Sequence, residues 1–524
     1  MAKITFMGAG STVFAKNVLG DCMCREALKD SHIALYDINK ERLIESEKML
    51  TTLNQNINGG RAKITTHLGV ANRKKALKGA DFVVNAIQVG GYEPSTVIDF
   101  EIPKKYGLRQ TIADTLGIGG IFRALRTIPV MLDFARDMEE VCPNAWFLNY
   151  TNPMAMLTGA MLRGTSVKTV GLCHSVQVCA QSLLMALNLY DEKKDGPFED
   201  LGYRTKIAGI NHMAWLLELT KDGKDVYPQM RKLGPKIVSK YRGGKEKHGN
   251  LIRLEMMNRF GYYVTESSEH NAEYAPYWIK AAYPELIDEY FIPLDEYPRR
   301  CVNQINNWKK QYKDICGNPK LDHKLSREYG SGIMNAIVTN TPYQIGGNVM
   351  NNGLITNLPS NAVVEVPCLV DANGVQGTYV GALPPQCAAM NMTNINVQLL
   401  TIEALSHSNV SISTMRQCLI RIPARNSIST ISSPCATTSS KLTGICSRNI
   451  TEPVRRLFDN CPAYSGFALY AVFLSPPPEN IQRQCITGRQ ACRLWEFYRI
   501  PASSKKICFF GNPLLTKRAL SHII

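Results

Sequence analysis

The feature that most constrains this chain is a regular alternation of short apolar runs and helical segments at its start. Residues 3–8 (KITFMG) predict a buried strand, GAGST predicts a tight turn, and VFAKNVLGDCM predicts the start of a helix. A second strand (HIALYD, 32–37) precedes a helical pattern from Lys40 to about Met49. Such alternation is typical of a doubly wound parallel sheet, which binds its ligand at the carboxyl ends of the strands.

The same pattern continues to about residue 200 and then changes. Further strands are expected at 81–91, 145–150 and 169–173, and helices at 120–140 and after Pro153. Beyond residue 200, strands closed by a Lys221-Asp222-Gly223 turn, a hairpin signal at Asn352-Gly353 and a helix from Arg300 indicate mixed α and β structure. We therefore predict an α/β protein with a Rossmann-like doubly wound parallel sheet, followed by a mixed α+β second domain.

The first turn carries part of a dinucleotide-binding pattern. Gly8 and Gly10 follow a strand and open a helix, and Asp37 ends the next strand. Glycines let a pyrophosphate approach the helix N-terminus, and the carboxylate can bind the ribose hydroxyls. A carboxylate repels a 2′-phosphate, so Asp37 favours NAD over NADP. Val13 stands where a third glycine would be, and a merely tight turn is the alternative interpretation.

A thiol and two imidazoles follow later apolar runs. Cys173 and His174 end the strand at 169–173, and His212 follows another apolar run in GINHMA. A thiolate and an imidazole with open positions would suit Mn²⁺, Fe²⁺ or Zn²⁺. The alternative is that these are unrelated residues of the core.

The segment TESSEHNAEYAPYW (265–278) places carboxylates, a histidine and aromatic rings close together. Its helical spacing is typical of a solvent-exposed face. The functional interpretation is a strip that binds sugar and transfers protons, formed by Glu266, Glu269, His270, Glu273 and Tyr274.

Two glycine-containing loops and two asparagines complete the candidate residues. GGYEPS (90–95) contains Glu93, and TIADTLGIGG (111–120) contains Asp114. Asn149 and Asn152, in LNYTNP, offer amide donors at a strand end. They could equally form a turn and a helix N-cap before Pro153.

The net charge of +16 is unevenly distributed over the 524 residues. Residues 405–524 carry 15 Lys or Arg against 4 Asp or Glu, whereas the first 404 residues carry 45 against 40. The body is thus nearly balanced, and we expect neither a nucleic-acid partner nor a membrane partner, although a nucleic-acid-binding tail is the competing interpretation. Irregular cysteine spacing and no signal-peptide pattern indicate a cytoplasmic location.

The combined motifs resemble one known family. GAGST, GGYE, ADTLGIGG, NYTNPMA, GLCHSV, GINHMA and VEVPCLVDANG, between residues 1 and about 404, look like the NAD-dependent glycoside hydrolases of family 4, closest to the α-galactosidase branch. The resemblance implies that NAD⁺ oxidises C3 of the sugar, a base removes the C2 proton, and the C1 substituent leaves by elimination. Water then adds and the hydride returns. This is an exception to hydrolysis by two carboxylates.

The resemblance also implies the sites. Cys173 and His212 match the metal ligands, for Mn²⁺ or another divalent metal. Asn152 matches a substrate contact, and Glu93 and Asn149 are added to it as substrate candidates. The cofactor site matches Gly8, Gly10, Ser11, Thr12 and Asp37.

The catalytic candidates are His174, Asp114, Glu266 and His270. His174 occupies the place where phospho-sugar members have an aspartate acid, and Asp114 looks like the residue that tunes the base. Ile118 replaces the proline of the family's usual GPGG.

The expected division is an NAD-binding domain at 1–200, a substrate, metal and oligomerisation domain at 201–404, and a non-native tail at 405–524. The predicted substrate is a small α-galactoside such as melibiose, and the chain is expected to form a dimer or tetramer. Alternatives are a sibling α-glucosidase or α-galacturonidase, an NAD-dependent hydroxy-acid dehydrogenase, and an inactive product.

The tail has none of the family's features. The peptide after residue 404 can be back-translated and read one nucleotide earlier, and with permitted codons it gives FTQQREHIYHAAMLDPHTGAELD and further family-like text before a stop. A random peptide would rarely allow this. The hypothesis is a frameshift near codon 405, in the gene or in its sequencing.

Overall fold

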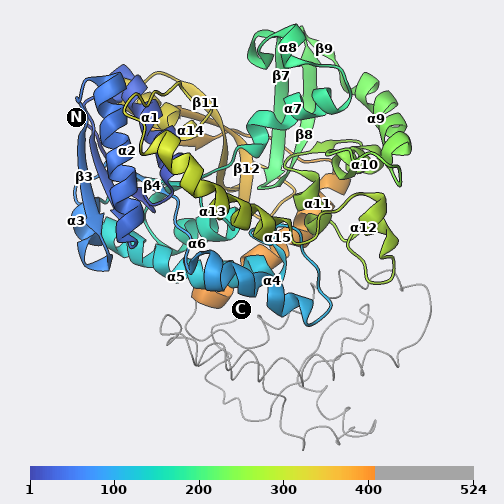
Figure 1. Cartoon of the computed structure of the whole chain (residues 1–524). Coiled ribbons are helices and arrows are strands. Elements are labelled where there is room, and N and C mark those ends of the chain that lie inside the picture. The colour runs from blue at the N-terminus through green and yellow to red at the C-terminus, as the bar shows by residue number, and fades with distance from the viewer. Residues whose placement is uncertain (407–524) are drawn as a thin grey trace, which may run out of the picture. The chain divides into compact units, whose positions relative to one another are not determined.

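A computed structural model describes residues 1–406, in which the strands form one mixed sheet (Figure 1). The predicted frameshifted tail lies outside the described residues, except at its first two positions. The strands are β1 (Lys3–Met7), β2 (His32–Asp37), β3 (Lys63–Leu68), β4 (Phe82–Asn85), β5 (Trp146–Asn149), β6 (Lys168–Leu172), β7 (Tyr203–Ile210), β8 (Met213–Lys221), β9 (Lys224–Asp225), β10 (Tyr263–Val264), β11 (Tyr343–Met350), β12 (Val363–Asp371) and β13 (Gly374–Gly377).

The N-terminal half of the sheet is parallel and runs in the order β3-β2-β1-β4-β5-β6. Met7 of β1 lies opposite both Tyr36 of β2 and Asn85 of β4. The strand order reverses between β1 and β4, and such a switch point opens a crevice at the carboxyl ends of the strands. The predicted doubly wound parallel sheet is confirmed.

The second half continues the same sheet with antiparallel strands. β11 pairs with β6, β12 with β11, and β7 with β12, followed by β8 and β10. In Figure 1 the blue N-terminal strands and the green β7 and β8 lie on opposite sides, with β12 between them. The mixed α and β structure predicted beyond residue 200 is confirmed, but its strands extend the first sheet. The predicted domain boundary at 200 stays a prediction.

The described residues form both longer and shorter helices. The longer ones are α1 (Thr12–Cys24), α2 (Lys40–Asn58), α4 (Val97–Lys104), α5 (Gly117–Val141), α6 (Met154–Gly164), α7 (Ser175–Ala186), α9 (Tyr227–Tyr241), α10 (Leu251–Phe260), α13 (Glu296–Ile315), α14 (Tyr329–Thr339) and α15 (Pro385–Ser406). The shorter ones are η1 (Glu26–Leu28), η2 (Val70–Asn72), α3 (Arg73–Leu77), η3 (Gly91–Thr96), α8 (Glu192–Asp195), η4 (Phe198–Asp200), α11 (Ser268–Tyr274) and α12 (Glu285–Glu289).

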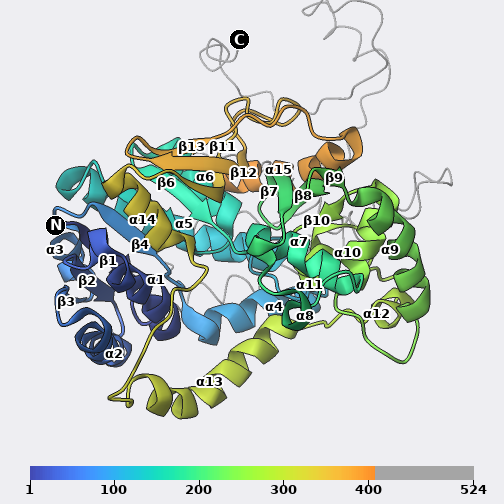
Figure 2. The same ribbon diagram turned by 90° about the horizontal axis from the view of Figure 1, so that it is seen from above.

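Two helix groups sandwich the sheet (Figures 1 and 2). α1 packs on α14, while α5, α6 and α15 pack together. A Cβ at Gly159 of α6 would lie 2.6 Å from Cδ1 of Ile402, so glycine allows α15 to approach closely. The core includes the fully buried rings of Phe6, Phe147 and Trp215. Among the described helices, none has the length and apolar character that crossing a bilayer requires.

Several local predictions differ from the structure. The Asp222-Gly223 turn joins β8 to the short β9, whereas the β7–β8 hairpin turns at Asn211 and His212. Helix α2 extends nine residues past the predicted end, because the helix continues until the left-handed Gly59 ends it. At its start, the side chain of Asn39 caps the helix, as the predicted start at Lys40 requires. The 265–278 segment forms α11, but interpreting it as a solvent-exposed face is wrong, because His270 and Tyr274 are 7% and 0% exposed.

Candidate functional site

The candidate site lies where the parallel strands β1, β4, β5 and β6 reach their carboxyl ends. Gly8 has φ +86°, and a Cβ there would lie 2.7 Å from the carbonyl oxygen of Ala86, just after β4. Beside it, Thr151 donates its hydroxyl to the carbonyl of Ile87 at 3.1 Å. Only glycine permits this close approach of the turn after β1 to the end of β4.

The predicted cofactor residues cluster at the start of α1. Oδ2 of Asp37 accepts a hydrogen bond from the N–H of Gly10 at 2.7 Å, and a Cβ on Gly10 would lie 2.8 Å from that oxygen. Ser11 is the N-cap residue of α1. Thr12 is also here, but its hydroxyl is buried and lies 3.1 Å from that of Ser46 on α2. The first N–H groups of any α-helix have no partner within the helix, so the start of α1 suits a pyrophosphate.

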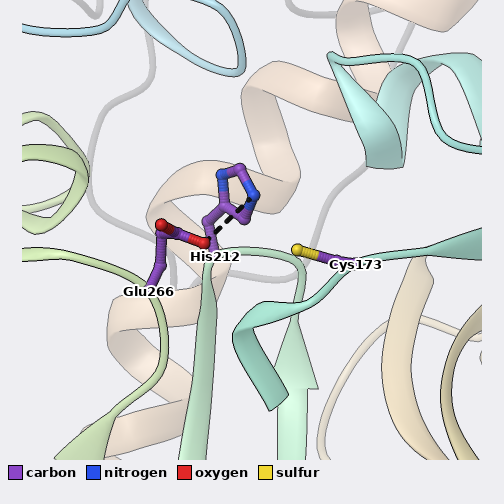
Figure 3. A group of neighbouring side chains, drawn as sticks. All are labelled: Cys173, His212 and Glu266. Carbon is purple, nitrogen blue, oxygen red and sulfur yellow. Dashed lines mark ion pairs between the residues drawn. The ribbon is translucent and has the colours of Figure 1, made fainter. Parts of the chain in front are cut away.

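Three potential metal ligands come from three distant segments. Cys173 follows β6, His212 lies in the β7–β8 turn, and Glu266 follows β10. One ligand atom from each lies within 4.8 Å of the others. In Figure 3, the Cys173 sulfur and the Glu266 carboxylate approach from opposite sides of the view, with His212 between them. The structure therefore brings the predicted pair Cys173 and His212 together and adds the carboxylate of Glu266.

The backbones of His212 and Glu266 are both left-handed, with φ of +61° and +65°. Such conformations are uncommon outside glycine and cluster at functional sites. The neighbouring strands hold them: Thr265 donates its N–H to the carbonyl of Ala214 at 2.8 Å and accepts from the Ala214 N–H at 3.0 Å. This clamp fixes the residues just before Glu266 against those just after His212.

Hydrogen bonding defines which nitrogen of His212 faces the cluster. The hydroxyl of Thr115 donates to Oδ1 of Asp114 at 2.7 Å and lies 3.1 Å from Nδ1 of His212. Since the Thr115 proton goes to Asp114, its oxygen accepts from the Nδ1–H of His212. Nε2 of His212 then presents a lone pair, 3.6 Å from Oε2 of Glu266.

The donor set fits a divalent metal. A thiolate, an imidazole and a carboxylate suit Mn²⁺, Fe²⁺ or Zn²⁺. Burial raises the pKa of the Cys173 thiol to about 12, with the charges of Glu365 and Glu266 adding to it. A coordinating metal deprotonates such a thiol. A divalent cation bound here would balance the negative charges of the Cys173 thiolate and the Glu266 carboxylate.

A proton-handling group adjoins the cluster. Oδ1 of Asp114 lies 3.7 Å from Nε2 of His270, and Oε1 of Glu266 lies 3.5 Å from its Nδ1. Burial alone would lower the pKa of His270, but these two carboxylates raise it above its usual value. For the carboxylates of Asp114 and Glu266 burial has the opposite effect and alone would raise the pKa. The neighbouring imidazoles nevertheless hold both pKa values below their usual range.

Asn152 joins this group, whereas Asn149 and Glu93 do not. Nδ2 of Asn152 donates to Oδ2 of Asp114 at 3.0 Å, and its buried Oδ1 has no hydrogen-bond partner within the described residues. Asn149 is 0% exposed and its amide is used by Asn85 and by neighbouring groups inside the sheet. The structure therefore gives Asn149 a role in the sheet. Glu93 is exposed in η3.

His174 points to a different partner. Its Nε2 lies 2.7 Å from Oε2 of Glu328, in the segment just before α14. This hydrogen bond raises the pKa of His174, against the opposing effect of burial. The imidazole is half-exposed and is therefore accessible to a substrate. It adjoins Cys173 in the chain but does not belong to the three-residue cluster.

Sequence reasoning assigned no individual role to four residues that organise the site: Thr115, Glu273, Glu328 and Glu365. Glu273 accepts the backbone N–H groups of three successive loop residues, starting with Thr111 at 2.5 Å, and so holds the loop that carries Asp114. The ADTLGIGG and VEVPCLVDANG motifs contain Thr115 and Glu365. Nothing in the local sequence distinguishes Glu273 or Glu328 from surface carboxylates.

Comparison with known proteins decides the family. The model of family 4 glycosyl hydrolases matches residues 3–189, and the model of the family's C-terminal domain matches residues 207–420. The chain belongs to glycosyl hydrolase family 4. Its predicted resemblance to this family is confirmed.

Several relatives of this family 4 chain carry sugar-hydrolase names. It is 61% identical to the α-galactosidase of Bacillus subtilis (strain 168) over 404 residues, which cover 77% of this chain and 89% of the relative. It is 34% identical to an α-galactosidase of Rhizobium meliloti (strain 1021) over 418 residues, covering 77% and 80%. An α-glucosidase of Erwinia rhapontici is 30% identical over 430 residues, covering 77% and 90%.

Solved structures share the fold of this family 4 chain. A 6-phospho-α-glucosidase from gut microorganisms, in complex with NAD and Mn²⁺, matches with a TM-score of 0.61 at 20% identity over 80% of this chain and 92% of that one. A 6-phospho-β-glucosidase of Thermotoga maritima, with manganese, NAD⁺ and glucose-6-phosphate, matches with a TM-score of 0.58 at 19% identity, covering 81% and 98%.

Proposed function

We propose that this chain is an NAD-dependent α-galactosidase that hydrolyses small α-galactosides such as melibiose. The high identity to the Bacillus subtilis α-galactosidase supports this specificity. The observation that carries the proposal is the cluster of Cys173, His212 and Glu266, whose ligand atoms lie within 4.8 Å of one another, at the same sheet edge as the dinucleotide-type turn. Ordinary glycosidases need neither feature.

The chain's own residues offer places for two cofactors. Gly8, Gly10 and Ser11 form the turn for the pyrophosphate, and Asp37 lies at the end of β2 for the ribose. Cys173 and His212, with Glu266 as a third ligand, would hold Mn²⁺ or another divalent metal. When bound, NAD⁺ supplies a reversible hydride acceptor for C3 of the sugar, and the metal supplies a Lewis acid that polarises the C2 and C3 oxygens.

Proton transfers fall to two separate groups. His270, held between Asp114 and Glu266, is the group we assign to the C2 proton, because an imidazole between two carboxylates can hold and return a proton. His174, oriented by Glu328, is the group we assign to protonation of the leaving C1 oxygen. The two imidazoles have different carboxylate partners, so one can hold a proton while the other releases one.

Substrate contacts would come first from Asn152. Its unpaired carbonyl oxygen lies next to Asp114 and is available to a sugar hydroxyl. Glu93, which is exposed at the start of η3, is a second candidate. We also propose that the enzyme works in the cytoplasm as a dimer or tetramer.

The test is release of p-nitrophenol from p-nitrophenyl α-galactoside with and without NAD⁺ and Mn²⁺. We expect activity only when both are present, and no net accumulation of NADH, because the hydride returns to the sugar. NADH accumulating on hydroxy-acid substrates without p-nitrophenol release would contradict the proposal and indicate a dehydrogenase. A faster reaction with the α-glucoside would instead assign the sibling specificity.

A further inference from the structure

Glu365, on β12, is a buried carboxylate that the proposed chemistry does not use. It is 1% exposed. Two buried amides donate to its Oε1: Nδ2 of Asn348 at 2.9 Å and Nδ2 of Asn211 at 3.4 Å. Burying a carboxylate inside a sheet carries a desolvation cost that an apolar side chain would avoid, so we expect this one to serve a purpose other than packing. What the two amides connect indicates that purpose.

Each of the two amides contacts or adjoins a segment that carries one of the metal-ligand candidates. Asn211 immediately precedes His212 in the β7–β8 turn. Asn348 also donates to the carbonyl oxygen of Gly171 at 3.4 Å, two residues before Cys173. One carboxylate thus connects the segment that carries the thiol with the turn that carries the imidazole.

The register of the sheet places these residues in one transverse row. Gly171 of β6 lies opposite Asn348 of β11, Asn348 lies opposite Glu365 of β12, and Glu365 lies opposite Gly209 of β7. β12 pairs with β7 at this one position only. The row therefore crosses the junction of the parallel and antiparallel parts of the sheet at Gly171 and Asn348, and Glu365 lies where β12 meets β7.

Small residues give the row its space. A Cβ on Gly171 would lie 2.9 Å from Cβ of Asn348, and a Cβ on Gly209 would lie 2.7 Å from the carbonyl oxygen of Met213. Within the described residues, Oε2 of Glu365 and the Oδ1 atoms of Asn211 and Asn348 have no hydrogen-bond partner. Three unpaired buried oxygens lower the free energy of unfolding, so stabilising the fold does not explain this row of residues.

We propose that Glu365 is a positioning residue that sets the spacing between Cys173 and His212, through the amides of Asn348 and Asn211. The inference rests on the metal site of the proposed function. It concerns the hydrogen bonds that Glu365 accepts, and it assigns no proton transfer to this group.

The experiment measures Mn²⁺ affinity of the full chain by equilibrium dialysis, without substrate or turnover. Glu365→Met removes the acceptor and should weaken Mn²⁺ binding about 10–100-fold, as loss of an outer-shell partner typically does. Glu365→Gln keeps one acceptor oxygen and should bind within about threefold of the unchanged chain. With Co²⁺ as a probe, Glu365→Met should also alter the near-ultraviolet thiolate-to-cobalt band that reports on Cys173.

Asp137→Asn is the matched control. Asp137 is also a buried carboxylate, paired with Arg73 between α5 and α3, so its loss tests the general effect of disturbing a buried carboxylate. It should leave Mn²⁺ affinity unchanged. If Glu365→Met does not fold, Asn348→Ser provides the second test, because it removes the amide that bridges Glu365 and Gly171, and it should weaken Mn²⁺ binding in the same way.

The outcomes separate this inference from the proposed function. Unchanged Mn²⁺ affinity and an unchanged cobalt band in Glu365→Met, or in Asn348→Ser, would overturn it, as would Glu365→Gln binding as weakly as Glu365→Met. If the chain without substitutions binds no Mn²⁺, the proposed metal site is wrong and this inference is wrong with it. Normal Mn²⁺ affinity that does not depend on Glu365 would overturn only the inference.

Discussion

The Oε2 atom of Glu328 lies 2.7 Å from Nε2 of His174, in the segment that links α13 to α14. Asp21 of α1 anchors this segment by accepting the N–H of Ser326 at 2.7 Å and its hydroxyl at 2.6 Å. The hydroxyl oxygen of Ser326 in turn accepts the N–H of Glu328 at 3.1 Å. The nucleotide-side helix α1 thus fixes the carboxylate that orients the proposed acid.

Glu328→Gln should move the pH dependence of catalysis. Glu328 raises the pKa of His174, so the protonated imidazole persists to higher pH in the unchanged enzyme. An amide removes the charge, lowers that pKa, and should shift the basic limb of the kcat/KM profile to lower pH. The exposed Glu199, which pairs with Arg327, provides the control Glu199→Gln, which should leave the limb in place. An unmoved limb in Glu328→Gln would remove His174 from the role of acid.

Thr115→Val should weaken metal binding without removing a ligand. Its hydroxyl accepts from Nδ1 of His212 and donates to Asp114, so valine leaves the imidazole free to adopt the wrong tautomer. We expect Mn²⁺ affinity to fall about 10–100-fold. Equilibrium dialysis measures it, with Thr339→Val, a surface hydroxyl on α14, as the control. Equal affinities would mean that Thr115 does not orient His212.

Glu266→Gln distinguishes a metal ligand from a base. As a ligand, Glu266 supplies an anionic oxygen beside Cys173 and His212, so the amide should lower Mn²⁺ affinity at least about tenfold. His270→Asn, by contrast, should lower kcat by about 10²–10⁴-fold, as loss of an acid–base group does, while Mn²⁺ still binds. Unchanged metal affinity in Glu266→Gln, with kcat lost, would return Glu266 to the catalytic role that the sequence first predicted.

Glu273→Gln should loosen the loop that carries Asp114. The carboxylate accepts N–H groups from residues 111–113, where Ala113 has φ +51°. Replacing one acceptor oxygen with an amide NH₂ at this half-buried position should cost about 1–3 kcal/mol of stability and should lower kcat/KM. Thermal unfolding and kinetics check both effects. A variant with unchanged unfolding temperature and unchanged kcat/KM would contradict this role.

The coding DNA tests the predicted frameshift near codon 405. We expect codons that, read one nucleotide earlier, spell the acidic family-like segment and its stop. Resequencing should then show a lost or gained base, in the gene or in the earlier read. Codons that do not permit the alternative segment, together with an intact frame, would refute the hypothesis.

The parallel half of the fold could be predicted because its signals are local. Apolar runs, a glycine turn and the carboxylate of Asp37 each lie within one βα unit. The antiparallel half could not, since β11 and β12 come from residues 343–371 yet lie between β6 and β7. No local pattern specifies that insertion, which depends on how the whole sheet packs.

The site, too, contains residues that local sequence signals predict and residues that only the folded chain brings together. Cys173 and His212 could be proposed because each follows an apolar run within a family motif. The approach of Glu266 depends on the left-handed backbone after β10, and Glu273 and Glu328 act from other elements across the fold. Asn149 was predicted to contact substrate because it ends a strand, but the strand end lies inside the sheet, where its amide is already used.

The most direct test of the central claim is hydrolysis of an α-galactoside in D₂O, followed by mass spectrometry and NMR of the galactose produced. Elimination requires removal of the C2 proton and its replacement from solvent, so the account predicts deuterium at C2 whenever NAD⁺ and Mn²⁺ support turnover. Galactose that retains protium at C2, released at the same rate without NAD⁺, would contradict redox-elimination and indicate direct displacement at C1.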